Sequence, residues 1–110
     1  MTAAAEARVL ESLAAKAATA LSQPSASRTG EGVQAMADRV EAYVARLGAS
    51  VRQVVGQKAP IVEGVLGDDP GLPTLLVYDL YDIQPAVGQP GWSVPPFVAA
   101  IAAGRMGTTG

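Results

Sequence analysis

The side chains best suited to chemistry lie in one short segment, residues 78–85, which reads Tyr-Asp-Leu-Tyr-Asp-Ile-Gln-Pro. Its two carboxylates are Asp79 and Asp82. The segment begins at the last residue of an apolar run, residues 74–78. Ligands of α/β sheets collect at the carboxyl ends of such strands. These polar residues are therefore candidates for a binding or catalytic site. The alternative is structural, because Asp is also common at strand ends and turns.

The composition excludes several kinds of site. The 110 residues include no Cys and no His, so the chain has no thiolate or imidazole ligand and no Ser-His-Asp triad. Eight Lys and Arg against ten Asp and Glu give a net charge of -2, which argues against a nucleic-acid partner. No apolar stretch approaches the roughly 18 residues of a membrane span, and no basic region precedes an apolar one at the start. We therefore expect no membrane association and a cytoplasmic location.

Two helices are predicted before the candidate segment. Residues 3–21 place apolar side chains at three- and four-residue steps, with Thr2 as a candidate N-cap. A turn-rich connector follows at residues 22–30. The second helix is expected to end at Gly48 and to bury one apolar stripe, formed by Val33, Met36, Ala37, Val40, Val44 and Leu47.

Strands are predicted beyond Gly48, where the period of the pattern changes. Two β-branched runs, 51–55 and 61–66, are typical of strands, and the Asp-Pro-Gly sequence at 69–71 favours a tight turn. The near-continuous apolar run at 74–78 is typical of a central strand covered on both faces. In the Pro- and Gly-rich remainder, Trp92 and Phe97 are expected to anchor the loop.

Two helices followed by three or more strands predict an α/β fold. We interpret the chain as a single partial domain, 1–110, with a helical part (1–48), a strand part (49–82) and a Pro/Gly-rich loop (83–110). A core of this size is thin, and a central strand needs neighbours on both sides. The chain therefore looks like the beginning of a domain.

The ordered motifs resemble the zinc-dependent exopeptidase and deacylase family, which includes carnosinase-like dipeptidases, glutamate carboxypeptidases, acetylornithine deacetylase and succinyl-diaminopimelate desuccinylase. In that family an apolar strand leads into Tyr-Gly/Asn-His-Tyr-Asp-Val-Gln-Pro, then a Trp, a Pro-Pro-Phe and a Gly-Arg. The chain matches this order at Tyr78, Tyr81, Asp82, Gln84, Pro85, Trp92, Pro95, Pro96, Phe97, Gly104 and Arg105. Its Pro-Ser-Ala-Ser at residues 24–27 also resembles the family's Pro-Ser-x-Ser turn. The fold then expected is an incomplete piece of a zinc-exopeptidase-like catalytic domain.

The resemblance implies metal-assisted hydrolysis of a peptide or N-acyl amide bond in an intact relative, where a glutamate activates a zinc-bound water. It makes Asp82 the candidate catalytic residue, because the family's matching Asp orients the first histidine ligand. The position of that histidine is Leu80, which has no lone pair to donate to a metal. Asp79 would face away from Leu80 and Asp82 on an extended strand, so it is disfavoured as a replacement.

The family's remaining ligands and its glutamate would lie beyond Gly110. We therefore expect no metal-binding or cofactor-binding residue in this chain, zinc being the cofactor of intact family members only. The main hypothesis is an inactive fragment or pseudoenzyme, with peptide or N-acyl amino acid substrates only in an intact relative.

Two alternatives stay open. One is a non-catalytic binding module on the same partial fold, with self-association through exposed sheet edges. The other is a divergent active subgroup whose metal site is rebuilt with ligands from elsewhere.

Overall fold

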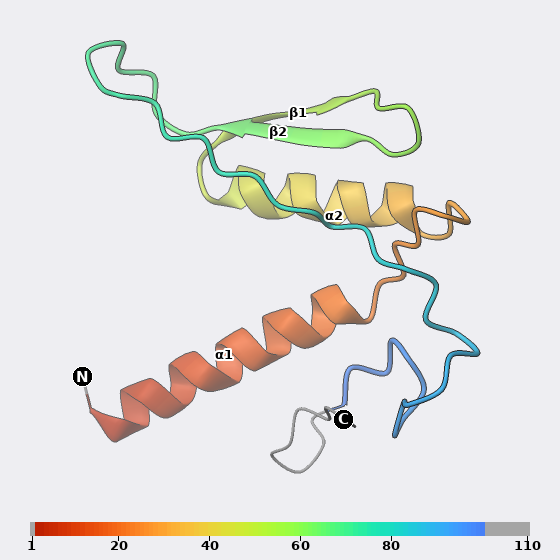
Figure 1. Cartoon of the computed structure of the whole chain (residues 1–110). Coiled ribbons are helices and arrows are strands. Elements are labelled where there is room, and N and C mark those ends of the chain that lie inside the picture. The colour runs from red at the N-terminus through yellow and green to blue at the C-terminus, as the bar shows by residue number, and fades with distance from the viewer. Residues whose placement is uncertain (1, 101–110) are drawn as a thin grey trace. The chain divides into compact units, whose positions relative to one another are not determined.

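The computed structural model describes residues 2–100, so the predicted matches at Gly104 and Arg105 lie outside the described residues. Its elements are, in chain order, α1 (Ala3–Leu21), α2 (Val33–Arg46), β1 (Ser50–Val54) and β2 (Ile61–Val65) (Figure 1). Two helices followed by a small sheet confirm the predicted α/β class. No helix within residues 2–100 is both long enough and apolar enough to cross a membrane.

The chain divides into two compact units, which are described separately. The first unit is Pro24–Pro85 and contains α2, β1 and β2. The second combines the described residues of Met1–Gln23 and Ala86–Gly110 and contains α1. The candidate segment and the Pro-Ser-Ala-Ser motif therefore both belong to the first unit.

Helix α1 has the predicted bounds and the predicted cap. Thr2 is extended, and its side-chain oxygen accepts the backbone N–H of Ala5 at 3.3 Å. This bond satisfies one of the donors that a helix leaves unpaired in its first turn. The apolar residues of α1 nevertheless stay exposed: Leu10 and Leu13 are 66% and 55% exposed, and no residue of the helix is buried.

Helix α2 covers one face of the β1–β2 hairpin (Figure 1). Val33 and Ala37 of the predicted stripe are buried, at 4% and 0% exposure, whereas Leu47 lies exposed at the end of the stripe. The helix approaches β2 closely at Gly64, where an added Cβ would lie 2.5 Å from Cγ1 of Val44. Gly48 has a φ of 89°, the left-handed conformation in which helices commonly end. The predicted stop is thus confirmed. The predicted stripe is buried at Val33 and Ala37, half-buried at Met36, Val40 and Val44, and exposed at Leu47.

The hairpin confirms two predicted strands to within one residue at each end. Strands β1 and β2 are antiparallel, and the register pairs Ser50 with Val65 and Val54 with Ile61. Beyond the hairpin, the carboxylate of Asp69 accepts the backbone N–H of Gly71 at 2.8 Å. This bond closes the predicted tight turn.

The predicted central strand at residues 74–78 is wrong for this structure. The run is not assigned to any strand, and Leu75, Leu76 and Val77 are 85%, 85% and 79% exposed. A strand buried on both faces needs neighbouring strands to pair its backbone and apolar layers to cover it. Within residues 2–100 the sheet consists of β1 and β2 alone, so the run at 74–78 has neither neighbouring strands nor covering layers.

The predicted loop anchors behave differently from each other. Trp92 is 57% exposed, so its predicted anchoring role is wrong. Phe97 is half-buried and has a φ of 70°, a conformation that bulky residues rarely adopt.

Candidate functional site

The candidate segment is held by the Pro-Ser-Ala-Ser turn. The Ser25 hydroxyl donates a hydrogen bond of 2.7 Å to the carbonyl of Tyr81, 56 residues away in the sequence. The backbone N–H of Ile83 donates to the carbonyl of Ser25 at 3.0 Å, and Ala26 forms a parallel bridge with Ile83. Two motifs that the sequence singled out separately therefore meet in the fold. Nothing in their spacing indicated this contact.

The backbone groups of the turn are paired locally. The N–H of Ala26 donates to the carbonyl of Glu31 at 2.9 Å, and the N–H of Gly30 donates to the carbonyl of Ala26 at 2.8 Å. Gly30 has a φ of 78°, which glycine adopts without steric cost. Ser25 and Ala26 are 1% and 3% exposed, so the turn presents the Ser25 hydroxyl from a buried position.

Tyr81 adds a second attachment for the segment. Its phenol donates a hydrogen bond to the carbonyl of Pro60, at the end of the loop that joins β1 and β2. Burial raises the pKa of the Tyr81 phenol, and the neighbouring Asp82 carboxylate raises it further. The neutral phenol, which can donate this bond, is therefore favoured.

The remaining predicted residues of the segment lie at the surface. Asp82 is exposed, and Leu80 is 75% exposed. The carboxylate of Asp79 accepts the backbone N–H of Leu80 at 2.7 Å, so it bonds to its own stretch of chain. Asp82 therefore lies exposed between two residues, Tyr81 and Ile83, whose backbone is hydrogen-bonded to Ser25. Asp79 makes a hydrogen bond within its own stretch of chain.

The described residues do not form a zinc site by themselves. A catalytic zinc takes about three protein ligands together with an open position. No group of three or more His, Cys, Asp or Glu side chains comes together within residues 2–100. The resemblance implies a histidine ligand at position 80, where the side chain of Leu80 carries no atom that can bind a metal. Asp82 remains the one predicted site residue on this part of the chain.

A polar network that sequence reasoning missed links α2 to β1. The Gln53 amide donates to Asp38 at 2.8 Å and to Glu41 at 2.7 Å, and the Gln34 amide donates to Asp38 at 2.8 Å. The bond from Gln53, followed by that from Gln34, lowers the pKa of the Asp38 carboxyl. The signal available in the sequence was the spacing of Gln34, Asp38 and Glu41, which places them on one helix face.

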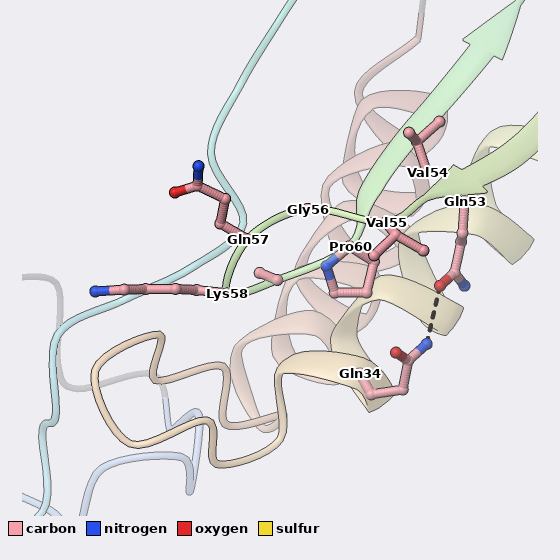
Figure 2. Close-up of a pocket in the computed structure, with 9 residues that line it drawn as sticks. Gln34, Gln53, Val54, Val55, Gly56, Gln57, Lys58 and Pro60 are labelled. Carbon is pink, nitrogen blue, oxygen red and sulfur yellow. Dashed lines mark hydrogen bonds between the residues drawn. The ribbon is translucent and has the colours of Figure 1, made fainter.

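A shallow hollow of about 310 Å³ lies beside this network, between the helix and the loop that follows β1. Figure 2 shows the Gln34 and Gln53 side chains pointing toward each other, joined by a hydrogen bond of 2.9 Å. Lys58 and Gln57 project away from this pair (Figure 2). Since these polar groups do not converge on the hollow, it offers no arrangement suited to a particular ligand.

Comparisons with known proteins show which proteins the chain is similar to. The chain is 38% identical over 76 residues to the Cys-Gly metallodipeptidase dug1 of Schizosaccharomyces pombe, a match that covers 60% of this chain and 16% of that protein. It is 51% identical over 41 residues to the Cys-Gly metallodipeptidase DUG1 of Candida albicans, covering 37% of this chain and 8% of that protein. The corresponding enzyme of Saccharomyces cerevisiae is 43% identical over 42 residues, with 38% and 9% covered. No protein-family model matches the chain, and neither does a solved structure.

These similarities confirm the resemblance drawn from the motifs. The chain resembles part of a dipeptidase-like zinc exopeptidase, and the matched relatives are Cys-Gly metallodipeptidases. The match spans only 16% of the length of the Schizosaccharomyces pombe relative.

Proposed function

We propose that the chain corresponds to the opening portion of a metallodipeptidase catalytic domain and hydrolyses no peptide bond by itself. The observation that supports the first part is the similarity to three Cys-Gly metallodipeptidases. The reaction class of an intact relative is then metal-assisted cleavage of a peptide or N-acyl amide bond, with short peptides such as Cys-Gly as substrates.

The proposed inactivity rests on the chemistry of the segment. Leu80 occupies the position of the family's histidine ligand, and a leucine side chain cannot bind a metal. Asp82 keeps the carboxylate that would orient such a histidine. The chain is therefore proposed to keep an orienting group without the ligand it orients.

Zinc binding and peptidase activity test this proposal together. The purified chain is equilibrated with zinc, desalted, assayed for bound zinc by elemental analysis, and incubated with the dipeptide Cys-Gly. We expect no stoichiometric zinc and no hydrolysis above the buffer rate. Stoichiometric zinc with turnover would contradict the proposal and favour a rebuilt metal site. Asp82→Asn is the matched variant. If the native chain hydrolysed Cys-Gly and this variant did not, the reaction would be assigned to this segment.

A second candidate function is a non-catalytic binding module. The exposed apolar run at residues 75–77 and the two outer edges of the β1–β2 hairpin favour it, since unpaired edges can accept a further strand. Light scattering over a range of concentrations tests it. A defined dimer that Leu76→Lys dissociates would support the module, and a clean monomer at all concentrations would contradict it.

A further inference from the structure

The backbone of Asp82 is bracketed by hydrogen bonds to a single residue. The carbonyl of Tyr81 belongs to the peptide group before Asp82, and the N–H of Ile83 belongs to the peptide group after it. The Ser25 hydroxyl donates to the first at 2.7 Å, and the Ser25 carbonyl accepts from the second at 3.0 Å. Since φ and ψ of Asp82 are the rotations between these two peptide groups, both rotations are restrained.

Ser25 can restrain this segment because it is buried in a hydrogen-bonded turn. It is 1% exposed and lies in the locally paired turn described above. The bridge between Ala26 and Ile83 extends the contact by one residue. The Asp82 side chain, in contrast, lies exposed on this restrained backbone.

We propose that Ser25 is a positioning residue, which fixes the backbone of Asp82 and so sets the direction in which its carboxylate leaves the chain. The inference rests on the proposed function, because it treats Asp82 as the orienting carboxylate. Direction matters for such a group, since hydrogen bonds weaken steeply when their geometry departs from linear. The proposal also explains why a serine is buried here: its hydroxyl reaches a carbonyl that a smaller apolar residue would leave unpaired.

Nuclear magnetic resonance on the full chain tests the proposal. Two quantities are measured: the exchange rate of the Ile83 amide hydrogen, and the scalar coupling that reports φ of Asp82. For Ser25→Ala we expect about tenfold faster exchange at Ile83 and a coupling averaged over several conformations, because one restraining bond is lost. The amides of the β1–β2 hairpin serve as an internal reference and should keep their rates.

Matched variants separate positioning from general stability. Ser27→Ala removes a hydroxyl from the same turn and should leave both quantities unchanged, whereas Ser25→Thr keeps the hydroxyl and should restore them. Should Ser25→Ala fail to fold, Ser25→Cys, a near isostere with a weaker donor, should still accelerate exchange at Ile83 selectively.

Three results would overturn the proposal. They are unchanged values in a folded Ser25→Ala or Ser25→Cys chain, an equal acceleration at the hairpin amides, or the same loosening in Ser27→Ala. No zinc or peptidase measurement enters this experiment. A failure here is therefore distinguishable from a failure of the proposed function.

Discussion

Helices α1 and α2 carry the same kind of apolar pattern but differ in what surrounds it. Val33 and Ala37 of α2, which packs on the β1–β2 hairpin, are buried, while no residue of α1 is buried. Apolar periodicity therefore predicted both helices and did not predict which one forms a core. A repeated apolar face shows that a helix can be buried. Whether it is buried depends on a second apolar surface against which that face can pack.

The two helices also begin differently. Helix α1 has a side-chain cap at Thr2 and many alanines, which are the best helix formers. Helix α2 begins after Gly32, which makes no side-chain capping bond. Local terms thus stabilise α1, and tertiary packing stabilises α2.

The largest expected effect is at the most buried position of α2. Ala37→Asp places a carboxylate where the side chain is 0% exposed, so we expect a loss of about 3 kcal/mol or more of unfolding free energy. Ala17→Asp makes the same change at an exposed site of α1 and should cost only about 0.5 kcal/mol, from helix propensity. Urea unfolding followed by circular dichroism measures both. Equal losses would refute the contrast between the helices.

The second-largest loss of stability is expected where α2 approaches β2 closely. Gly64→Ala puts a Cβ 2.5 Å from Val44, and we expect it to destabilise the Pro24–Pro85 unit by about 1–3 kcal/mol. The same substitution in a Val44→Ala background should cost less, since the overlapping methyl group is gone. Thermal unfolding of the four chains measures the coupling. A purely additive result would mean that Val44 is not the obstacle.

A smaller and local effect is expected at the start of α1. Thr2→Ala removes the cap, and we expect a loss of about 1 kcal/mol confined to the first turns of that helix. Amide exchange at residues 5–8 should quicken, while exchange in α2 stays unchanged. Thr2→Ser keeps the hydroxyl and should behave as the native chain. Loosening of α2 in the alanine variant would show that the two helices are not independent.

The smallest effect concerns the Asp38 network between α2 and β1. The pKa of Asp38 is lowered in the folded chain by its bonds from Gln53 and Gln34, so folding favours the charged carboxylate. The resulting stabilisation is present above its ordinary pKa of 3.8 and is lost as the pH falls through the lower folded value. Urea midpoints at several pH values between about 5 and 2 should show a small decline that Asp38→Asn reduces. An unchanged decline in that variant would assign the acid sensitivity to other groups.

Local patterns were enough to predict both helices and both strands. Thr2 was predicted as a cap, Gly48 as a helix stop and Asp69 as a turn residue, because each acts within a few residues of its own position. The motif order likewise indicated a resemblance to the zinc-dependent exopeptidase and deacylase family, which the similarity to a Cys-Gly metallodipeptidase confirms. The resemblance implied a histidine ligand at position 80, and the residue type alone shows that Leu80 cannot bind a metal.

Only the tertiary structure decided what depends on distant partners. The run at 74–78 has the composition of a buried strand, but burial requires neighbouring strands that residues 2–100 do not provide. The bond from Ser25 to Tyr81 joins positions 56 residues apart, and no local pattern specifies such a pairing. Sequence therefore determined the local elements and the chemical groups of this chain, because those follow from neighbouring residues. Burial and the bracketing of Asp82 were decided by the fold, because both need surfaces brought together from afar.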